Sequence, residues 1–138
     1  MRFLVDTNVL SELRKRQNAN YRVRAWFEGT PRESLFVSVM SVGELRQGVE
    51  QKRRSDPVAA NNLERWLEAL GTLYANRLLP VDERIADEWG RLSVPDRLPL
   101  VDGLLAATAL VHDLTIATRN VKDFDRSGAP TLNPFEAR

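Results

Sequence analysis

The sequence predicts an α/β protein, a three-layer α/β/α sandwich around a central, mainly parallel sheet, because short apolar runs alternate with helical stretches. The runs are unbroken rather than alternating with polar residues, which is typical of strands covered on both faces. Strands that are separated by helices pair in parallel through right-handed crossovers. The predicted strands are residues 3–5, 35–37, 78–81 and 115–117, with a short last strand within 128–134 that Pro134 interrupts.

Six helical stretches lie between these runs. Each shows apolar residues at helical spacing or follows a residue that caps helices. Two long stretches follow one another without a strand, which predicts a helical hairpin at about 41–76 that leans out from the sheet. Because no repeat or interdomain linker is visible, residues 1–138 are expected to form a single domain. The predicted helices are residues 8–17, 21–28, 41–54, 57–76, 83–92 and 100–112.

The composition is that of an ordinary globular protein. Apolar residues make up 43% and charged residues 28% of the 138 residues. No run approaches the ~18 apolar residues that a membrane span needs, and the Met1 end leads directly into a strand rather than a signal peptide. A cytoplasmic location is therefore expected.

The residue inventory excludes several kinds of chemistry. The absence of cysteine excludes disulfides, thiolate zinc sites and a cysteine nucleophile. The single histidine, His112, falls late in an apolar helix, where a structural role is favoured, so a Ser-His-Asp triad and a multi-histidine metal site are excluded. The glycines at 43, 48 and 71 are isolated within helices and form no phosphate-binding loop. Carboxylates remain as candidates.

The net charge of +1 provides no general attraction for nucleic acid. Cations nevertheless gather at residues 14–16 and 52–54. Such groups fit either solvated helix faces or a nucleic-acid contact, and composition does not decide between the two.

Four carboxylates occupy positions where an α/β protein builds sites, although each also has a local explanation. Asp6 follows the first strand, at the sheet edge where ligands bind, or caps the next helix. Glu44 fits a capping box that begins at Ser41. Asp102 lies in the first turn of an apolar helix, where the helix dipole favours a carboxylate, but a buried carboxylate needs a cation or donors. Asp123 follows the last long apolar run and also fits a turn.

These four side chains are expected to meet at one edge of the sheet. A cluster of like charges is unfavourable unless cations neutralise it. Ligation by oxygen alone selects Mg²⁺ or Mn²⁺ over zinc or copper. One or two such ions generate hydroxide from water and stabilise the attacking and leaving oxygens in phosphodiester hydrolysis. The cluster therefore favours a metal-dependent hydrolase.

Four segments resemble, in order, the four motifs of PIN-domain proteins, most closely those of the VapC/FitB type. The segments are Phe3–Leu10, Ser41–Leu45, Asp102–Ala109 and Thr118–Phe124, and the resemblance extends from Met1 to Phe135. It implies a PIN-like α/β/α sandwich, a Mg²⁺- or Mn²⁺-dependent endoribonuclease, and the toxin role in a type II toxin–antitoxin system.

The resemblance also assigns site residues. Asp6, Glu44 and Asp102 match three acidic positions that hold the metal and act in catalysis. The fourth position is either Asp123, taken as the acid, or Asn120, taken as an auxiliary residue. Two hydroxyl positions near the metal match Thr7 and Thr118. If the fourth position is uncharged, a second metal is weak or absent unless RNA supplies oxygens.

The partners implied by the resemblance are an RNA substrate, a second copy of the chain and a VapB-type antitoxin that blocks the site, in a heterotetramer or larger assembly. Val9, Leu10 and Leu13 are expected to line an antitoxin groove between the first helix and the helices within 41–76. An antitoxin arginine would then reach the acidic cluster. The aromatic side chains Trp26, Phe27, Trp66 and Trp89 are expected either at a homodimer surface or in the core of one chain, and the sequence does not decide between the two.

One alternative function comes from a different class. A protein of this fold can act mainly as a binding module, in a DNA-bound repressor complex with its antitoxin that contacts DNA only through the antitoxin. Metal-dependent cleavage of RNA by the antitoxin-free protein separates the two functions. The RNA target and the cut sequence are not fixed by the residues.

Overall fold

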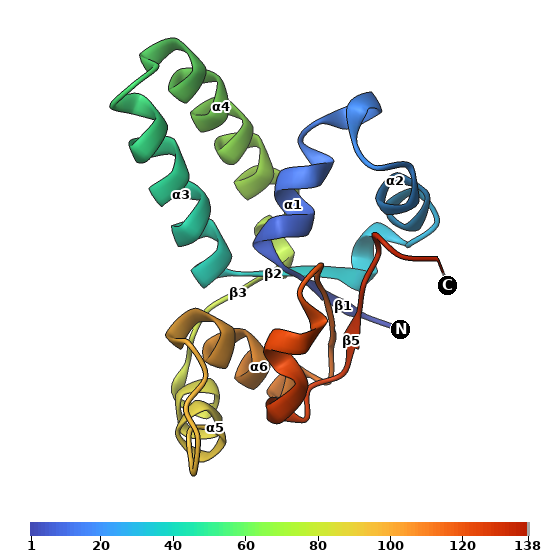
Figure 1. Ribbon diagram of the computed structural model, residues 1–138, viewed down its shortest axis with the longest axis vertical. Helices are drawn as coiled ribbons and strands as arrows, with labels where there is room; N and C mark the ends of the chain where they lie inside the picture. Colours follow the sequence, from blue (N-terminus) through green and yellow to red (C-terminus); the bar gives the residue numbers. More distant parts are fainter. Residues whose placement is uncertain (138) are drawn as a thin grey trace.

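The computed structural model, which describes residues 1–137, contains a five-stranded sheet in the order β3-β2-β1-β4-β5 with every pair parallel (Figure 1). The predicted parallel sheet is confirmed. β3 ends earlier than predicted because Pro80 has no backbone N–H to donate to a neighbouring strand. The strands are β1 Phe3–Val5, β2 Leu35–Ser38, β3 Leu78–Leu79, β4 Thr115–Ala117 and β5 Thr131–Leu132.

Six α-helices connect the strands. They are α1 Thr7–Leu13, α2 Tyr21–Glu28, α3 Val39–Arg53, α4 Pro57–Leu73, α5 Glu83–Leu92 and α6 Leu100–His112. Short 3₁₀ segments cover η1 Arg16–Asn18, η2 Arg32–Ser34, η3 Ala75–Arg77 and η4 Val121–Ser127. The bounds of α2, α5 and α6 agree with the predicted ranges. α1 is shorter than predicted, and Arg16 beyond it has a positive φ of 54°.

The start of α3 corrects the capping-box interpretation of Glu44. The N-cap is Ser38, whose hydroxyl accepts a hydrogen bond from the Met40 amide at 3.0 Å. Ser41 lies inside the helix and is buried. Glu44 therefore falls in the second turn of α3, where its carboxylate has no capping role.

Helices cover both faces of the sheet, as the unbroken apolar strands predicted. Successive residues of β1 point to opposite faces, so Phe3 and Val5 pack with α1, α2, α3 and α4, whereas Leu4 packs with α6. On β4, Ala117 lies on the first face and Ile116 on the second. α5 packs against α6 on the second face (Figure 1). The architecture is thus an α/β/α sandwich.

The helices α3 and α4 lie side by side and extend away from the sheet (Figure 1). The Arg53 guanidinium joins them, because it pairs with Glu50 on α3 and with Glu64 on α4. Arg46 also pairs with both glutamates, at 3.3 Å each. No helix within residues 1–137 is long and apolar enough to cross a bilayer.

The aromatic residues expected at a dimer surface or in the core are divided between the two. Trp26 is 5% exposed and packs edge-on against Phe3, with ring centroids 5.2 Å apart. Of the two positions expected for Trp26, the core is therefore the one that the structure shows, because this ring fills the core beneath α2. Phe27, Trp66 and Trp89 are partly exposed.

Candidate active site

The candidate site lies where the chain changes direction across the sheet. From β1 the chain runs to β2 and β3 on one side, and it then crosses to β4 on the other side. The crevice at the carboxyl ends of two strands that diverge in this way is where open α/β sheets bind ligands. Asp6 directly follows β1 and Thr118 directly follows β4. The parallel register pairs Val5 with Ala117, so the two polar residues are adjacent.

Three hydrogen-bond donors hold the Asp6 carboxylate in position. It accepts hydrogen bonds from the Thr118 hydroxyl at 2.8 Å, the Thr7 amide at 2.7 Å and the Asn8 amide nitrogen at 3.4 Å. The side chain also caps α1, so the helix-cap interpretation and the site interpretation hold together. Burial raises the pKa of Asp6 above its ordinary value, the two shorter hydrogen bonds lower it, and the charges of Glu44 and Asp123 raise it.

Glu44 reaches the same crevice from α3. Its carboxylate accepts a hydrogen bond from the Thr7 hydroxyl at 2.7 Å. Thr7 therefore links the two acids, because its amide contacts Asp6 while its hydroxyl contacts Glu44. The prediction that Thr7 and Thr118 lie beside the acids agrees with this geometry.

Asp102 comes from the first turn of α6. Its pKa is raised to about 6, first by burial and then by the charges of Asp6, Asp123 and Glu44. Its carboxylate accepts no hydrogen bond from residues 1–137, in contrast to Asp6. A carboxylate with negative neighbours and no donor is a group that gains from a cation.

Close packing holds Asp102 in place. A Cβ on the adjacent Gly103 would lie 3.0 Å from the Trp89 ring, so α6 approaches α5 more closely here than a larger residue allows. This glycine lets the first turn of α6, which carries Asp102, sit against the Trp89 indole.

The two candidates for the fourth position are placed differently: both line a hollow beside the crevice, and only Asn120 also lines the acidic pocket. Asn120 lines the acidic pocket, and its amide donates to the Thr118 hydroxyl at 3.0 Å. Asp123 lies on η4, is exposed, and lines the neighbouring hollow beside Lys122. Its charge nevertheless raises the pKa of both Asp6 and Asp102, so it belongs to the same electrostatic cluster.

Two residues of the pocket were not singled out from the sequence. Asn8 accepts a hydrogen bond from the Arg119 amide at 3.1 Å and thereby ties the start of α1 to the loop after β4. Gln47 lies one turn after Glu44 on the same face of α3, a spacing that sequence inspection could have used. The pocket has a volume of about 360 Å³ and is lined by Asp6, Thr7, Asn8, Glu44, Gln47, Asp102 and Asn120.

The donor set fits a hard divalent cation held largely by water. No three Asp, Glu or His side chains within residues 1–137 are close enough to enclose a metal ion on their own. Mg²⁺ usually keeps several waters and uses one or two carboxylates together with substrate phosphates. Asp6 and Asp102, which line the same crevice, fit that mode of binding.

Loss of the Thr118 hydroxyl is expected to destabilise the protein. In Thr118→Val, the buried Asp6 carboxylate loses its closest side-chain donor, which costs about 1–3 kcal/mol of unfolding free energy. The measurement is urea unfolding at pH 7. The matched control is Thr108→Val, which removes an equally buried hydroxyl that donates only to a helix carbonyl. Equal stability of Thr118→Val and the wild type would contradict the assigned role.

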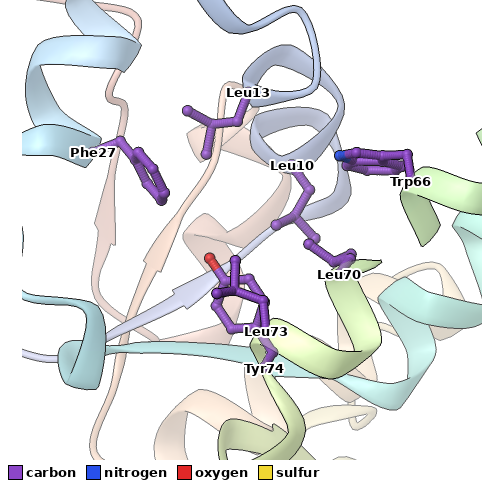
Figure 2. A pocket seen from close by; sticks show the side chains of 7 residues that line it. All are labelled: Leu10, Leu13, Phe27, Trp66, Leu70, Leu73 and Tyr74. Carbon is purple, nitrogen blue, oxygen red and sulfur yellow. The ribbon is translucent and has the colours of Figure 1, made fainter. Parts of the chain in front are cut away.

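A second hollow, about 140 Å³ in volume, lies between α1, α2 and α4 (Figure 2). Leu10 and Leu13 of α1, two of the three residues expected to line an antitoxin groove, line this hollow, which is bounded by α2 and α4 and not by the pair α3 and α4 as expected. Val9 does not line it, and this prediction is wrong, because the Val9 side chain is fully buried in the core cluster. The remaining lining residues are Phe27, Trp66, Leu70, Leu73 and Tyr74.

The fold and the crevice define an α/β/α protein with acidic residues at the carboxyl edge of a parallel sheet. A family model described as PIN domain matches residues 3–129, and the chain belongs to this family. Toxin FitB of Neisseria gonorrhoeae is 34% identical over 137 residues, which cover 96% of this chain and 97% of that protein. VapC ribonuclease Y4jK of Sinorhizobium fredii is 34% identical over 142 residues, which also cover 96% and 97%.

Comparison with solved structures also shows similarity to toxin–antitoxin proteins of this family. A structure of FitAB bound to an IR36 DNA fragment superposes with a TM-score of 0.86 and 32% identity, and the match covers 99% of this chain and 97% of that chain. The resemblance to PIN-domain proteins of the VapC/FitB type and the predicted α/β/α fold are therefore confirmed.

Proposed function

We propose that this protein is the toxin of a VapBC- or FitAB-like toxin–antitoxin system and acts as a metal-dependent endoribonuclease. The observation that carries the proposal is the convergence of Asp6, Glu44 and Asp102 in one crevice of a chain whose relatives include a protein named a VapC ribonuclease. The physical support is that this cluster contains carboxylates and amides but neither histidine nor cysteine.

In this proposal, Asp6 and Asp102 would hold Mg²⁺ or Mn²⁺, and Glu44 would orient the water that attacks the phosphate. The cation supplies an activated water and charge stabilisation for phosphodiester hydrolysis. Thr118 and Thr7 keep Asp6 and Glu44 in fixed rotamers, because each hydroxyl donates to one carboxylate.

Other groups of the pocket would bind the RNA. The exposed carboxamide of Gln47 offers N–H donors to a phosphate or a ribose hydroxyl. Asn120 is proposed as an auxiliary residue within the pocket. Asp123 contributes charge from η4 and is proposed as the fourth acid, which would help to hold the cation.

The test is cleavage of total RNA by the purified, antitoxin-free protein with Mg²⁺, followed by mapping of the RNA ends. Discrete new ends that disappear with a chelator support the proposal and also identify the target. RNA that stays intact at every cation concentration contradicts it.

We further propose that an antitoxin segment occupies the hollow of Figure 2, because Leu13 and Phe27 present apolar surface there. An amphipathic helix lays its apolar face into such a groove. An extended tail could carry an arginine to the acidic pocket, where its guanidinium replaces the charge of the cation.

Leu13→Glu is expected to weaken antitoxin capture at least about tenfold, because an unpaired carboxylate would be buried in the apolar contact. The measurement is a pull-down against the neighbouring gene product. Val58→Glu is the control, since Val58 is 72% exposed on α4 and does not line the hollow. Equal capture of Leu13→Glu and Val58→Glu would contradict antitoxin binding in this hollow.

A homodimer is also proposed. Val94 and Leu100 are 76% and 56% exposed around the connection from α5 to α6, and a second copy would cover these two side chains. A stable dimer needs about 800 Å² buried per partner. Light scattering is expected to return twice the chain mass of 15.7 kDa at micromolar concentrations, and the single-chain mass would count against the dimer.

A second function, repression of transcription as part of a DNA-bound complex, is favoured by the similarity to the FitAB–DNA structure. The chain carries a net charge of only +1, so DNA contact is proposed to come from the antitoxin. A gel shift by the complex, with none by this chain alone, would support this role.

A further inference from the structure

A groove of about 250 Å³ leads from the acidic pocket along α1, between that helix and the pair α3 and α4. We call it the flanking groove. Thr7 and Glu44 line both the acidic pocket and the flanking groove, so the two are continuous. At its other end Trp66 lines the flanking groove and also the apolar hollow of Figure 2.

Arg14 provides an uncommitted cation in the flanking groove. It is exposed, and within residues 1–137 its guanidinium has no ion pair, no hydrogen bond and no aromatic ring beneath it. Two arginines of α3, Arg46 and Arg53, do not line the groove and are held by Glu50 and Glu64. Arg14 is therefore free to meet an anionic group that enters the groove.

Trp66 provides an aromatic surface in the same groove. Figure 2 shows its ring beside α1, at the margin of the apolar hollow and away from Phe27. The ring is partly buried, so its orientation is fixed by the packing of α4, while part of its face remains accessible. A fixed, accessible indole is a surface on which a nucleobase can stack.

Gly48 keeps the groove open. It lines the flanking groove on α3, and a Cβ built on it would meet no atom within 4 Å. A side chain at this position would extend into open space rather than into the core. The groove can therefore be filled by substitution without disturbing the fold.

We propose that the flanking groove binds the single-stranded RNA next to the scissile phosphate, with a base on Trp66 and a neighbouring phosphate on Arg14. This inference rests on the proposed ribonuclease function. RNA is favoured over a protein occupant because the groove opens directly onto the acidic pocket. It also pairs one cation with one aromatic ring, the arrangement that binds single strands without regard to sequence. The apolar hollow, in contrast, has no charged side chain in its lining.

The test is fluorescence anisotropy with a labelled single-stranded RNA of mixed sequence, about twelve nucleotides long. Every protein carries Asp102→Asn so that the RNA is not cut. Trp66→Leu is expected to weaken binding about tenfold because stacking is lost, and Trp66→Phe restores most of the affinity. Arg14→Gln should reduce the slope of log affinity against log salt by about 0.7, the value for one phosphate of a single strand, and Arg14→Lys should retain the slope.

Gly48→Leu tests the groove independently of Trp66 packing. It is expected to weaken RNA binding more than Gly48→Ala does, because only the larger side chain fills the groove. RNA affinity that stays unchanged in both Gly48→Leu and Arg14→Gln overturns the inference. If these variants lose antitoxin capture while they keep RNA affinity, the groove is a protein-binding surface and the inference also fails.

Different results would contradict the ribonuclease function and the assignment of the flanking groove. If the protein with an intact Asp102 cuts no RNA, the ribonuclease function is contradicted whatever the anisotropy shows. If it cuts RNA and the groove variants bind RNA normally, the function stands and the flanking groove is not the binding surface.

Discussion

Asp102→Asn and Asp6→Asn are each expected to lower RNA cleavage at least about a hundredfold while the fold is kept. Replacing a group that only supports a metal ligand typically costs 10–100-fold, so loss of a proposed ligand itself should cost more. Asp102 accepts no hydrogen bond from residues 1–137, so the amide removes no contact that stabilises the fold. The measurement is single-turnover cleavage with Mg²⁺, with circular dichroism to check folding.

The matched control is Asp125→Asn. Asp125 is an exposed aspartate on η4, two residues from Asp123, and it does not line the acidic pocket. Its substitution removes one negative charge from the same region and is expected to leave cleavage unchanged. Equal losses in Asp125→Asn and Asp102→Asn would point to a general charge effect, and full activity in Asp102→Asn would remove the metal mechanism.

Divalent cations are expected to stabilise the protein, and to do so more strongly at pH 7.5 than at pH 5. A cation at about one hundred times its dissociation constant adds roughly 2.7 kcal/mol of unfolding free energy. The pKa of Asp102 is raised to about 6, so at pH 5 most of this carboxyl is protonated and the cation must compete with the proton. Thermal unfolding with and without Mn²⁺ at both pH values measures the difference.

The metal-free protein should show the opposite dependence on pH. The folded pKa of Asp102 lies above its ordinary value of 3.8, so between the two the folded state binds more protons than the unfolded state. Stability due to this group is therefore present at low pH and is lost as pH rises through about 6. Asp6, whose pKa is also raised, acts in the same direction. In Asp102→Asn the loss of stability with rising pH should be smaller. An identical pH profile of stability in the variant and the wild type would contradict the raised pKa of Asp102.

Much of the fold was predictable because its signals are local. The short apolar runs at β1, β2 and β4 have no polar alternation, which by itself requires cover on both faces of the sheet. The proximity of Asp6 to Asp102 was predictable for a related reason, since strand ends and helix starts share one edge of a parallel sheet.

Other features depend on tertiary geometry that a linear pattern does not contain. Val9 and Leu10 are adjacent apolar residues of one helix, and only the packing of α1 shows that Leu10 lines the hollow whereas Val9 does not. The sequence around Glu44 fits a capping box, but α3 starts at its N-cap Ser38, which excludes a capping role for Glu44. The positions of Asn120 and Asp123 depend on how η4 follows the loop after β4: Asn120 lines the acidic pocket, and Asp123 lies exposed beside it.

The proposed metal site is tested most directly by an anomalous difference map from crystals of the antitoxin-free protein soaked in Mn²⁺. The expected result is a peak in the crevice at the carboxyl ends of β1 and β4, within ligand distance of the carboxylates of Asp6 and Asp102, and absent in Asp102→Asn. A peak bound elsewhere on the protein, or an empty crevice in crystals of a preparation that cleaves RNA with Mn²⁺, would contradict a metal site made by these carboxylates.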